Sequence, residues 1–142
     1  MVLDEQRRQR YLEKLDQLEF NFTVSKDGLN KLAIKKFEIL EIYGVLHGIQ
    51  LTIEALTDIS AMTVKDLNKL AKNNYENLSE LQSQGIITNK IKNSLYKLVG
   101  LRNRIAHDYN GLDDKLALKS FEENIPSIQI FIEGLKQWIK KK

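Results

Sequence analysis

The sequence contains no cysteine, one proline and only seven glycines in 142 residues. The absence of cysteine excludes disulfide bonds and thiolate metal sites. Scarce helix breakers, together with abundant leucine, isoleucine, lysine and glutamate, favour helices joined by short turns. A chain of this length can bury enough surface to form one core. We therefore predict an all-α fold, a single domain over residues 1–142 that forms an antiparallel bundle of about five helices.

Long hydrophobic runs and metal-binding patterns are also missing. No apolar run reaches the ~18 residues of a membrane span, and the N-terminal residues lead directly into charge, so we expect a soluble, cytoplasmic protein that binds no membrane. The two histidines, His47 and His107, lack a second ligand at zinc-site spacing. No glycine-rich phosphate loop or nucleophile elbow is present. We expect no metal or other cofactor, and we interpret His47 as a packed or partly exposed helix residue.

Hydrophobic spacing predicts where the first three helices lie. The first begins after an N-cap at Asp4 and ends within residues 21–28, where small and β-branched residues weaken the pattern. The second covers about residues 29–59 and is apolar on more than one face, so we expect it to be central and packed on two sides. The third begins at Thr63, which resembles the start of a capping box, and stops at Gly85.

Two further helices complete the predicted bundle. The fourth begins at an N-cap residue, Thr88, and frays near residues 110–111, an Asn-Gly pair suited to left-handed conformations. The fifth begins at about Asp113 and extends to the C-terminus, with a kink or a restart at Pro126. Tyrosines at helical core spacing are interpreted as packing residues: Tyr11, Tyr43, Tyr75 and Tyr96.

The net charge is unevenly distributed. Lys140, Lys141 and Lys142 alone account for the formal charge of +3. Residues 81–107 contain no acidic residue, and a basic segment of this kind is typical of contact with a nucleic-acid backbone. This segment carries the cations Lys90, Lys92, Lys97, Arg102 and Arg104.

Arg102 occupies an unusual position in the fourth helix. It falls on the same helical stripe as Leu95 and Leu98, which predicts a position facing the core or an interface. Burying an unpaired cation costs several kcal/mol, so Arg102 either pairs with an acid such as Glu41 or Glu54 or faces an anionic ligand. Both interpretations remain open.

Arg102 and His107 do not share a helix face. Their separation places the two side chains about 140° apart on a straight helix, whereas Asn103 and His107 are i,i+4 neighbours. Cooperation of Arg102 with His107 therefore requires either that the helix unwind near Ala106 or that a two-fold axis bring two chains together.

Arg102, His107 and Tyr109 reproduce an Arg-x4-His-x-Tyr motif, and Asn103 directly follows the arginine. In this motif and in its helical layout, most of the chain resembles HepT-like toxins of the HEPN superfamily of helical ribonucleases and nucleotide-binding proteins. The resemblance implies a metal-independent endoribonuclease in which a ribose 2′-hydroxyl attacks the adjacent phosphate. It also implies that His107 transfers protons, that Arg102 clamps the phosphate and that Asn103 orients the histidine or the phosphate. Candidates for binding the RNA backbone are Lys90, Lys92, Lys97 and Arg104.

We predict two protein partners. One, from the divergence of Arg102 and His107, is a second copy of the chain, in a homodimer with the site at its two-fold axis. The other, implied by the resemblance, is a minimal nucleotidyltransferase antitoxin of the MNT type, which inactivates the toxin by attaching AMP to Tyr109. Two alternatives remain: a non-catalytic nucleotide- or partner-binding module that acts with a nucleotidyltransferase, and a purely structural helical dimer in which Arg102 is paired internally.

Overall fold

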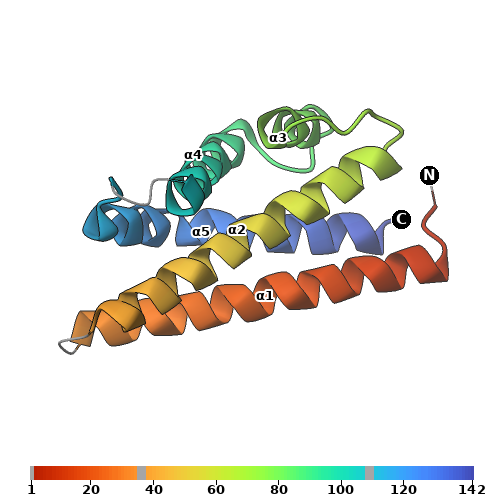
Figure 1. Ribbon diagram of the computed structural model, residues 1–142. Coiled ribbons are helices and arrows are strands. Elements are labelled where there is room, and N and C mark those ends of the chain that lie inside the picture. Colours follow the sequence, from red (N-terminus) through yellow and green to blue (C-terminus); the bar gives the residue numbers. More distant parts are fainter. Residues whose placement is uncertain (1, 35–37, 108–110) are drawn as a thin grey trace.

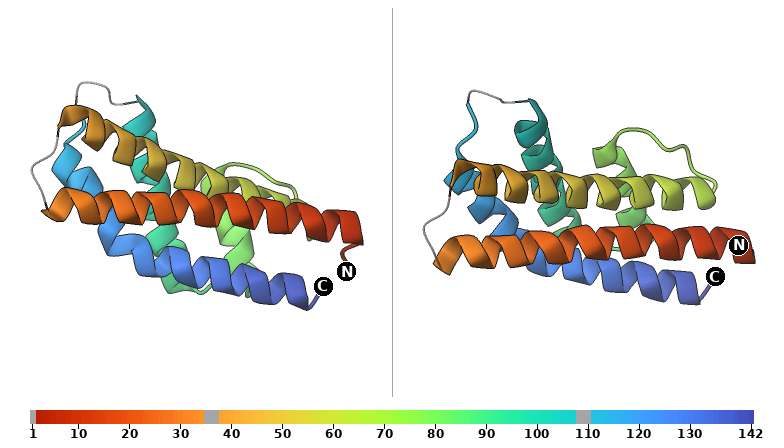
Figure 2. Two further views of the ribbon diagram at one scale, coloured as in Figure 1. Left: turned by 90° about the horizontal axis from the view of Figure 1, so that it is seen from below. Right: turned by 60° about the horizontal axis from the view of Figure 1, so that its bottom comes forward.

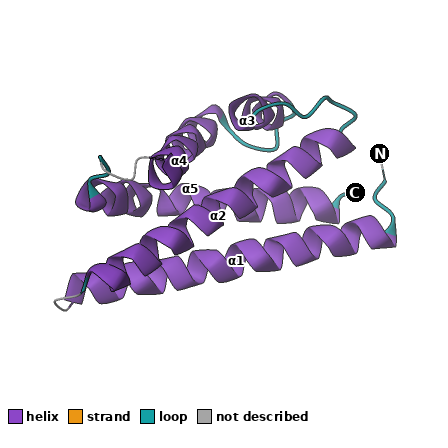
Figure 3. Ribbon diagram, in the orientation of Figure 1, coloured by secondary structure: helices purple, strands orange, loops and turns teal. Residues whose placement is uncertain are grey.

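The computed structural model describes residues 2–34, 38–107 and 111–142, which form the helices labelled in Figure 1. Within these ranges the regular secondary structure consists of helices, joined by loops and turns (Figure 3), which confirms the predicted all-α fold of about five helices. The helices are α1 (Glu5–Ile34), α2 (Ile39–Asp66), α3 (Asn74–Ser83), α4 (Asn89–His107) and α5 (Asp114–Lys140).

The second helix is the centre of the bundle, as its apolar faces predict. α2 contacts each of the other four helices. α1 and α2 run antiparallel side by side, α5 lies along α1, and α3 and α4 cover the other side of α2 (Figures 1 and 2). This arrangement places α4, which carries the motif, directly against α2.

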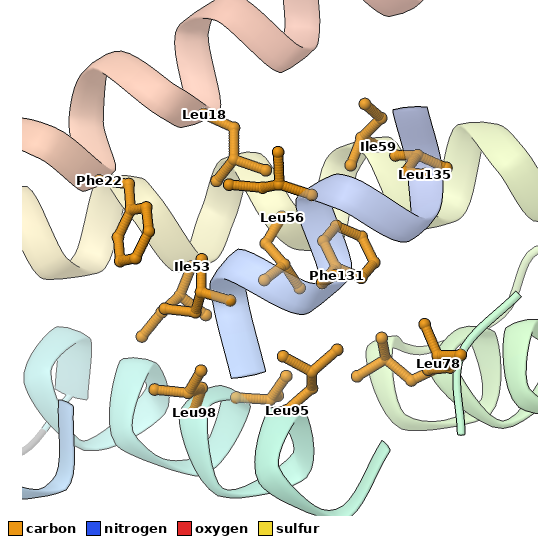
Figure 4. Packing of buried hydrophobic residues seen from close by; sticks show 14 of the residues in the cluster. Leu18, Phe22, Ile53, Leu56, Ile59, Leu78, Leu95, Leu98, Phe131 and Leu135 are labelled. Carbon is orange, nitrogen blue, oxygen red and sulfur yellow. The ribbon is translucent and has the colours of Figure 1, made fainter. Parts of the chain in front are cut away.

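All five helices contribute to one cluster of buried apolar side chains. Figure 4 shows these side chains converging between the helices. Complete burial of several large aliphatic and aromatic residues gives each helix a fixed inner face, which determines the direction of the remaining side chains. The labelled members are Leu18, Phe22, Ile53, Leu56, Ile59, Leu78, Leu95, Leu98, Phe131 and Leu135.

The predicted end of the first helix within residues 21–28 is wrong, because the small residues there serve close packing. α1 continues to Ile34. A Cβ atom on Gly28 would lie 2.8 Å from Cγ2 of Val45, and one on Gly48 would lie 2.8 Å from Oγ of Ser25. Small residues therefore let α1 and α2 approach closely. Because α1 extends to Ile34, α2 begins at Ile39, later than predicted.

The predicted start of the third helix is also wrong. Thr63 is buried within α2, and its hydroxyl donates to the Ile59 carbonyl at 2.8 Å. α2 continues to Asp66, and the N-cap of α3 is Asn73, whose side chain accepts from the backbone N–H of Glu76. A threonine hydroxyl can bond the carbonyl one turn back within a helix, and sequence spacing does not distinguish such a residue from a cap. The predicted stop at Gly85 is confirmed by its φ of +76°.

Two predicted N-caps are confirmed. Asp4 accepts from the backbone N–H of Arg7 at 2.7 Å, and Thr88 accepts from that of Ile91 at 3.2 Å. The predicted start of the fifth helix at about Asp113 is also confirmed, and Asp113 is the N-cap of α5. α5 continues through Pro126, so no restart occurs there, although the axis of α5 changes direction along its length (Figure 2). The fourth helix was predicted to fray near residues 110–111, and Asn110 lies outside the described residues.

Among the described residues, α2 is the one helix with the length and composition of a membrane span. Its qualifying 18-residue window has a mean hydropathy of 1.3, and 28% of that window is buried. A search for uninterrupted apolar runs does not identify α2, because polar and charged residues interrupt its sequence. α2 packs against every other helix of the bundle, which is the place of a core helix.

A polar network joins the end of α2 to the start of α1. The guanidinium of Arg7 donates from Nε and Nη2 to Oδ2 and Oδ1 of Asp66, at 2.7 and 2.9 Å. The hydroxyl of Tyr11 donates to Oδ2 of Asp66 at 2.7 Å. Tyr11 is fully buried, so Asp66 satisfies a donor that has no access to water.

Candidate functional site

α4 has a buried face toward α2 and α5 and an exposed face on which the motif residues Asn103 and His107 lie. Its inner face contains Ile91, Leu95, Leu98, Val99 and Leu101. Arg102 projects from the inner side, as predicted, and is half-buried. The structure therefore separates the motif into an arginine directed toward α2 and a histidine directed toward solvent.

The guanidinium of Arg102 is held by Glu54 of α2. Nε and Nη2 donate to Oε1 of Glu54 at 3.1 and 2.9 Å. The amide of Gln50 donates to the same oxygen at 3.0 Å. The two charged side chains are 29% and 33% exposed, so this is a partly buried ion pair. The alternative that Arg102 pairs with an acid is thereby confirmed for Glu54.

The environment of Glu54 favours its ionised form. Partial burial alone would raise the pKa of the Glu54 carboxyl. Hydrogen bonds from Gln50 and Arg102, with the electrostatic attraction of Arg102 and His47, outweigh burial and hold the pKa below its ordinary value. Glu54 is therefore a carboxylate near neutral pH, and it fixes the direction of the Arg102 guanidinium.

Glu54 uses only part of the donor capacity of Arg102. The two bonds to Glu54 come from Nε and Nη2, while Nη1 donates to Oδ1 of Asn103 at 3.4 Å. A guanidinium has five N–H donors, so those on Nη1 and the second on Nη2 point away from the ion pair. Arg102 is thus positioned by an acid and still has donors for an anion.

α4 remains helical through His107. Of the two arrangements that would let Arg102 and His107 cooperate, unwinding near Ala106 is therefore not observed, and Arg102 and His107 of one chain diverge by about 140°. Asn103 and His107 are one turn apart and both exposed. Within a single chain, Asn103 lies between the other two: it bonds Arg102 and shares the face of His107.

The predicted RNA-binding cations occupy two parts of the α4 surface. Lys90, Lys97 and Arg104 recur every seven residues and are all exposed, so they form a row on one side of the helix. Lys92 lies apart from this row, with Nζ 5.5 Å from the centroid of the Tyr96 ring. The row adjoins the face that carries Asn103 and His107.

Two of the sequence predictions concern the site of AMP attachment and the binding of a metal ion. Tyr109, the predicted site of AMP attachment, lies outside the described residues. Within the ranges that the structure describes, no group of three or more His, Cys, Asp or Glu residues is arranged to hold a metal ion.

Sequence reasoning named Glu54 only as one of two possible partners of Arg102 and did not identify Gln50. A signal was present, because His47, Gln50 and Glu54 are spaced by three and four and so share one face of α2. That face meets α4 only through the packing of two helices far apart in the sequence, and His47 itself is an exposed helix residue, as predicted.

Comparisons with known proteins agree with this geometry. The model of the family described as "Ribonuclease HepT-like" matches residues 9–135. An Archaeoglobus fulgidus protein described as "Putative RNase" is 34% identical over 135 residues, which cover 95% of this chain and 97% of that protein. These matches extend over nearly the whole chain and include α4.

Solved structures give the class of fold. A tri-AMPylated HEPN toxin of Shewanella oneidensis, solved in complex with its MNT antitoxin, superposes with a TM-score of 0.80 at 20% identity, over 89% of this chain and 96% of that one. The cytosolic Bacillus subtilis protein YutE, of unknown function, superposes with a TM-score of 0.77 at 14% identity, over 99% and 94%. The fold is therefore the all-α fold of HEPN toxins. With the family match and the archaeal relative, we conclude that this chain belongs to the HepT-like ribonuclease family.

Proposed function

We propose that this protein is a metal-independent endoribonuclease toxin, paired with an MNT-type nucleotidyltransferase antitoxin, that acts in the cytoplasm. One observation carries the proposal: on a helix without acidic residues, an exposed His107 shares a face with Asn103, and Asn103 bonds a guanidinium that has free donors. Imidazole and guanidinium together supply proton transfer and charge stabilisation for phosphodiester chemistry, without a metal.

The chemistry requires three groups. A base removes the proton of a ribose 2′-hydroxyl, whose oxygen attacks the adjacent phosphorus. The bond to the 5′-oxygen breaks, and that oxygen leaves with a proton, which yields a 2′,3′-cyclic phosphate and a free 5′-hydroxyl. His107 transfers protons, and Arg102 stabilises the charge on the phosphoryl oxygens through its remaining donors. Asn103 orients Arg102 and the phosphate.

The divergence of Arg102 and His107 within one chain supports a homodimer. The exposed part of α2 toward its N-terminus carries Ile39, Leu40 and Tyr43, an apolar surface suited to burial against a second copy. Tyr43 lies on the same helical face as Glu54 and so belongs to the surface next to Arg102. A two-fold axis here would place Arg102 of one copy opposite His107 of the other.

The ion pair with Glu54 is the observation that favours a second candidate, a non-catalytic nucleotide- or partner-binding module. In that case, Arg102 would contribute to structure and to anion binding only. The third alternative, a purely structural dimer, predicts an internally paired Arg102 and no basic surface at His107. The pair is present, but the row of cations on α4 is present as well.

We expect the purified protein to cleave single-stranded RNA in excess EDTA at the same rate as with Mg²⁺, because the reaction needs no metal. The measurement is gel analysis of end-labelled RNA, with the cyclic phosphate identified by mass spectrometry. An oligonucleotide with 2′-O-methyl ribose, which lacks the nucleophile, serves as the control and should stay intact. Nucleotide binding without cleavage of any RNA would support the binding module instead.

We expect incubation with ATP and the partner nucleotidyltransferase to stop RNA cleavage. In this transfer the phenol oxygen of Tyr109 attacks the α-phosphorus of ATP, pyrophosphate leaves, and the added anion competes with RNA for the nearby cations. Intact-mass measurement should show AMP on the wild type and on Tyr43→Phe, an exposed tyrosine elsewhere. The Tyr109→Phe variant should remain unmodified and active. If incubation with ATP and the nucleotidyltransferase also stops RNA cleavage by this variant, Tyr109 is excluded as the regulatory site.

A further inference from the structure

Tyr75 presents an exposed ring beside α4. It lies in the first turn of α3, and 39% of its surface is exposed. Tyr43 is 57% exposed, so the interpretation that core spacing places these residues in the core is wrong for both Tyr43 and Tyr75. The Tyr75 ring meets the Tyr96 ring edge to face, with centroids 5.1 Å apart and planes at 87°. Exposed tyrosine rings with a fixed orientation are a common platform for nucleobases.

The backbone of α3 is anchored without the Tyr75 side chain. The Tyr96 hydroxyl donates to the backbone carbonyl of Tyr75 at 3.0 Å and is also hydrogen-bonded to the Ser79 hydroxyl. Tyr96 is half-buried and therefore serves as the structural member of the pair. The phenol of Tyr75 is left to reach across the surface of α4.

Gly100 leaves an opening on α4 beneath that phenol. A Cβ atom at this position would lie 3.8 Å from the Tyr75 hydroxyl and 3.9 Å from Nη1 of Arg104, both ordinary contacts. Packing therefore does not require glycine here, although glycine within a helix is less stable than alanine by about 1 kcal/mol. Because Gly100 has no side chain, a gap remains between the phenol of Tyr75 and the guanidinium of Arg104. We call this gap and the residues around it the Tyr75–Gly100 surface.

The charges around the Tyr75–Gly100 surface are complementary to phosphate on the α4 side. Arg104 borders the gap, and Lys92 lies over the Tyr96 ring. The acidic residues nearby, Glu76 and Glu80, both belong to α3. A strand would therefore direct its phosphates toward α4 and its bases toward α3.

The Tyr75–Gly100 surface is continuous with the candidate catalytic face. Gly100 and His107 are two helical turns apart, which is about 10 Å along the axis and about 20° around it. Asn103 lies between them on the same face. An RNA strand that follows this face from His107 would pass over Gly100 and meet the Tyr75 ring.

On the basis of the ribonuclease function proposed above, we propose that the Tyr75–Gly100 surface is a stacking site for one unpaired base of single-stranded RNA, with Arg104 on its phosphate. Stacking accepts any base, because each has a π-face, whereas a paired base in duplex RNA is already stacked. The site therefore selects single-stranded RNA over duplex RNA and contributes little base preference.

The test compares two uncleavable RNA strands of equal length, one with bases and one with abasic residues at every position, both with 2′-O-methyl ribose. Wild-type protein should bind the strand with bases about tenfold or more tightly, because stacking of one base contributes that much. Tyr75→Leu should lose this preference while its affinity for the abasic strand stays unchanged. Tyr75→Phe, which keeps the ring, should bind both strands as the wild type does.

A matched control and a separate activity measurement make the result decisive. Phe20→Leu removes another exposed aromatic ring, on α1, and should change neither affinity. Equal preference for bases in wild type and Tyr75→Leu would overturn the stacking site. If Tyr75→Leu keeps the wild-type preference for bases but binds the nucleotidyltransferase more weakly, this surface binds the protein partner and not RNA. Cleavage of unmodified RNA by the wild type is scored independently, so failure of the nuclease function is distinguished from failure of the stacking site.

Discussion

Replacing His107 with alanine is expected to reduce the rate of RNA cleavage by about 10²–10⁴, because the reaction loses its proton-transfer group. His107 is exposed at the end of α4 and contributes nothing to the buried cluster, so the helical content and the thermal midpoint should stay at wild-type values. His47→Ala is the matched control, because it removes the other exposed histidine and should retain most of the activity.

Replacing Arg102 with alanine is expected to reduce cleavage by about 10²–10³, the usual effect of removing one donor that stabilises developing charge. This variant leaves Glu54 without its cation, so the fold should be checked by circular dichroism. Arg102→Lys keeps the charge but loses the forked donors, and it should be intermediate. Wild-type cleavage by both the His107 and the Arg102 variants would exclude this motif as the catalytic site.

Mixing the two inactive variants tests whether the site spans two chains. If Arg102 of one copy works with His107 of the other, mixed dimers of Arg102→Ala and His107→Ala contain one intact site. Random assortment should then restore roughly a quarter of wild-type activity, because half of the dimers are mixed and each has one working site of two. No recovery after the subunits have exchanged would place both residues of a working site in one chain.

Replacing Asp66 with alanine is expected to lower the free energy of unfolding by about 3 kcal/mol. The loss follows because the guanidinium of Arg7 and the buried hydroxyl of Tyr11 both lose their acceptor. The measurement is urea unfolding followed by circular dichroism. Asp58→Ala removes an exposed carboxylate of the same helix and should change stability by less than about 0.5 kcal/mol. A similar small change for Asp66→Ala would show that this network contributes little.

The pH dependence gives the same network a second readout. Burial, and then the hydrogen bond to Asp66, raise the pKa of Tyr11 well above its ordinary value. A pKa that is higher in the folded state gives stability that is complete below the unfolded value of about 10 and is lost as the pH rises further. Tyr11→Phe should therefore remove this part of the loss of stability in alkaline solution.

The sequence predicted features that depend on neighbouring residues. The N-caps at Asp4 and Thr88 were found because a cap and the amide it binds are three residues apart. The end of α1 was misplaced because Gly28 is explained only by its contact with Val45 of another helix. Small residues mean a turn in one context and close packing in the other.

The same distinction applies to the site. An arginine on an apolar stripe required a partner, so pairing was predictable from the cost of burying its charge. The choice of Glu54 was not predictable, because it depends on how α2 and α4 are aligned. The meeting of Tyr75 with Gly100 depends in the same way on how α3 crosses α4.

The two chain ends meet at one end of the bundle. The backbone N–H of Leu3 donates to the carbonyl of Lys142 at 3.1 Å, and both termini lie at the opposite end of the molecule from the α4 end that carries His107 (Figures 1 and 2). The three terminal lysines, equal in number to the net charge of +3, therefore lie at the end of the bundle remote from His107. Because the ends are adjacent, a short linker can join them, and new termini can be made in the loop between α2 and α3. Such a circularly permuted chain keeps α4 and its neighbours intact.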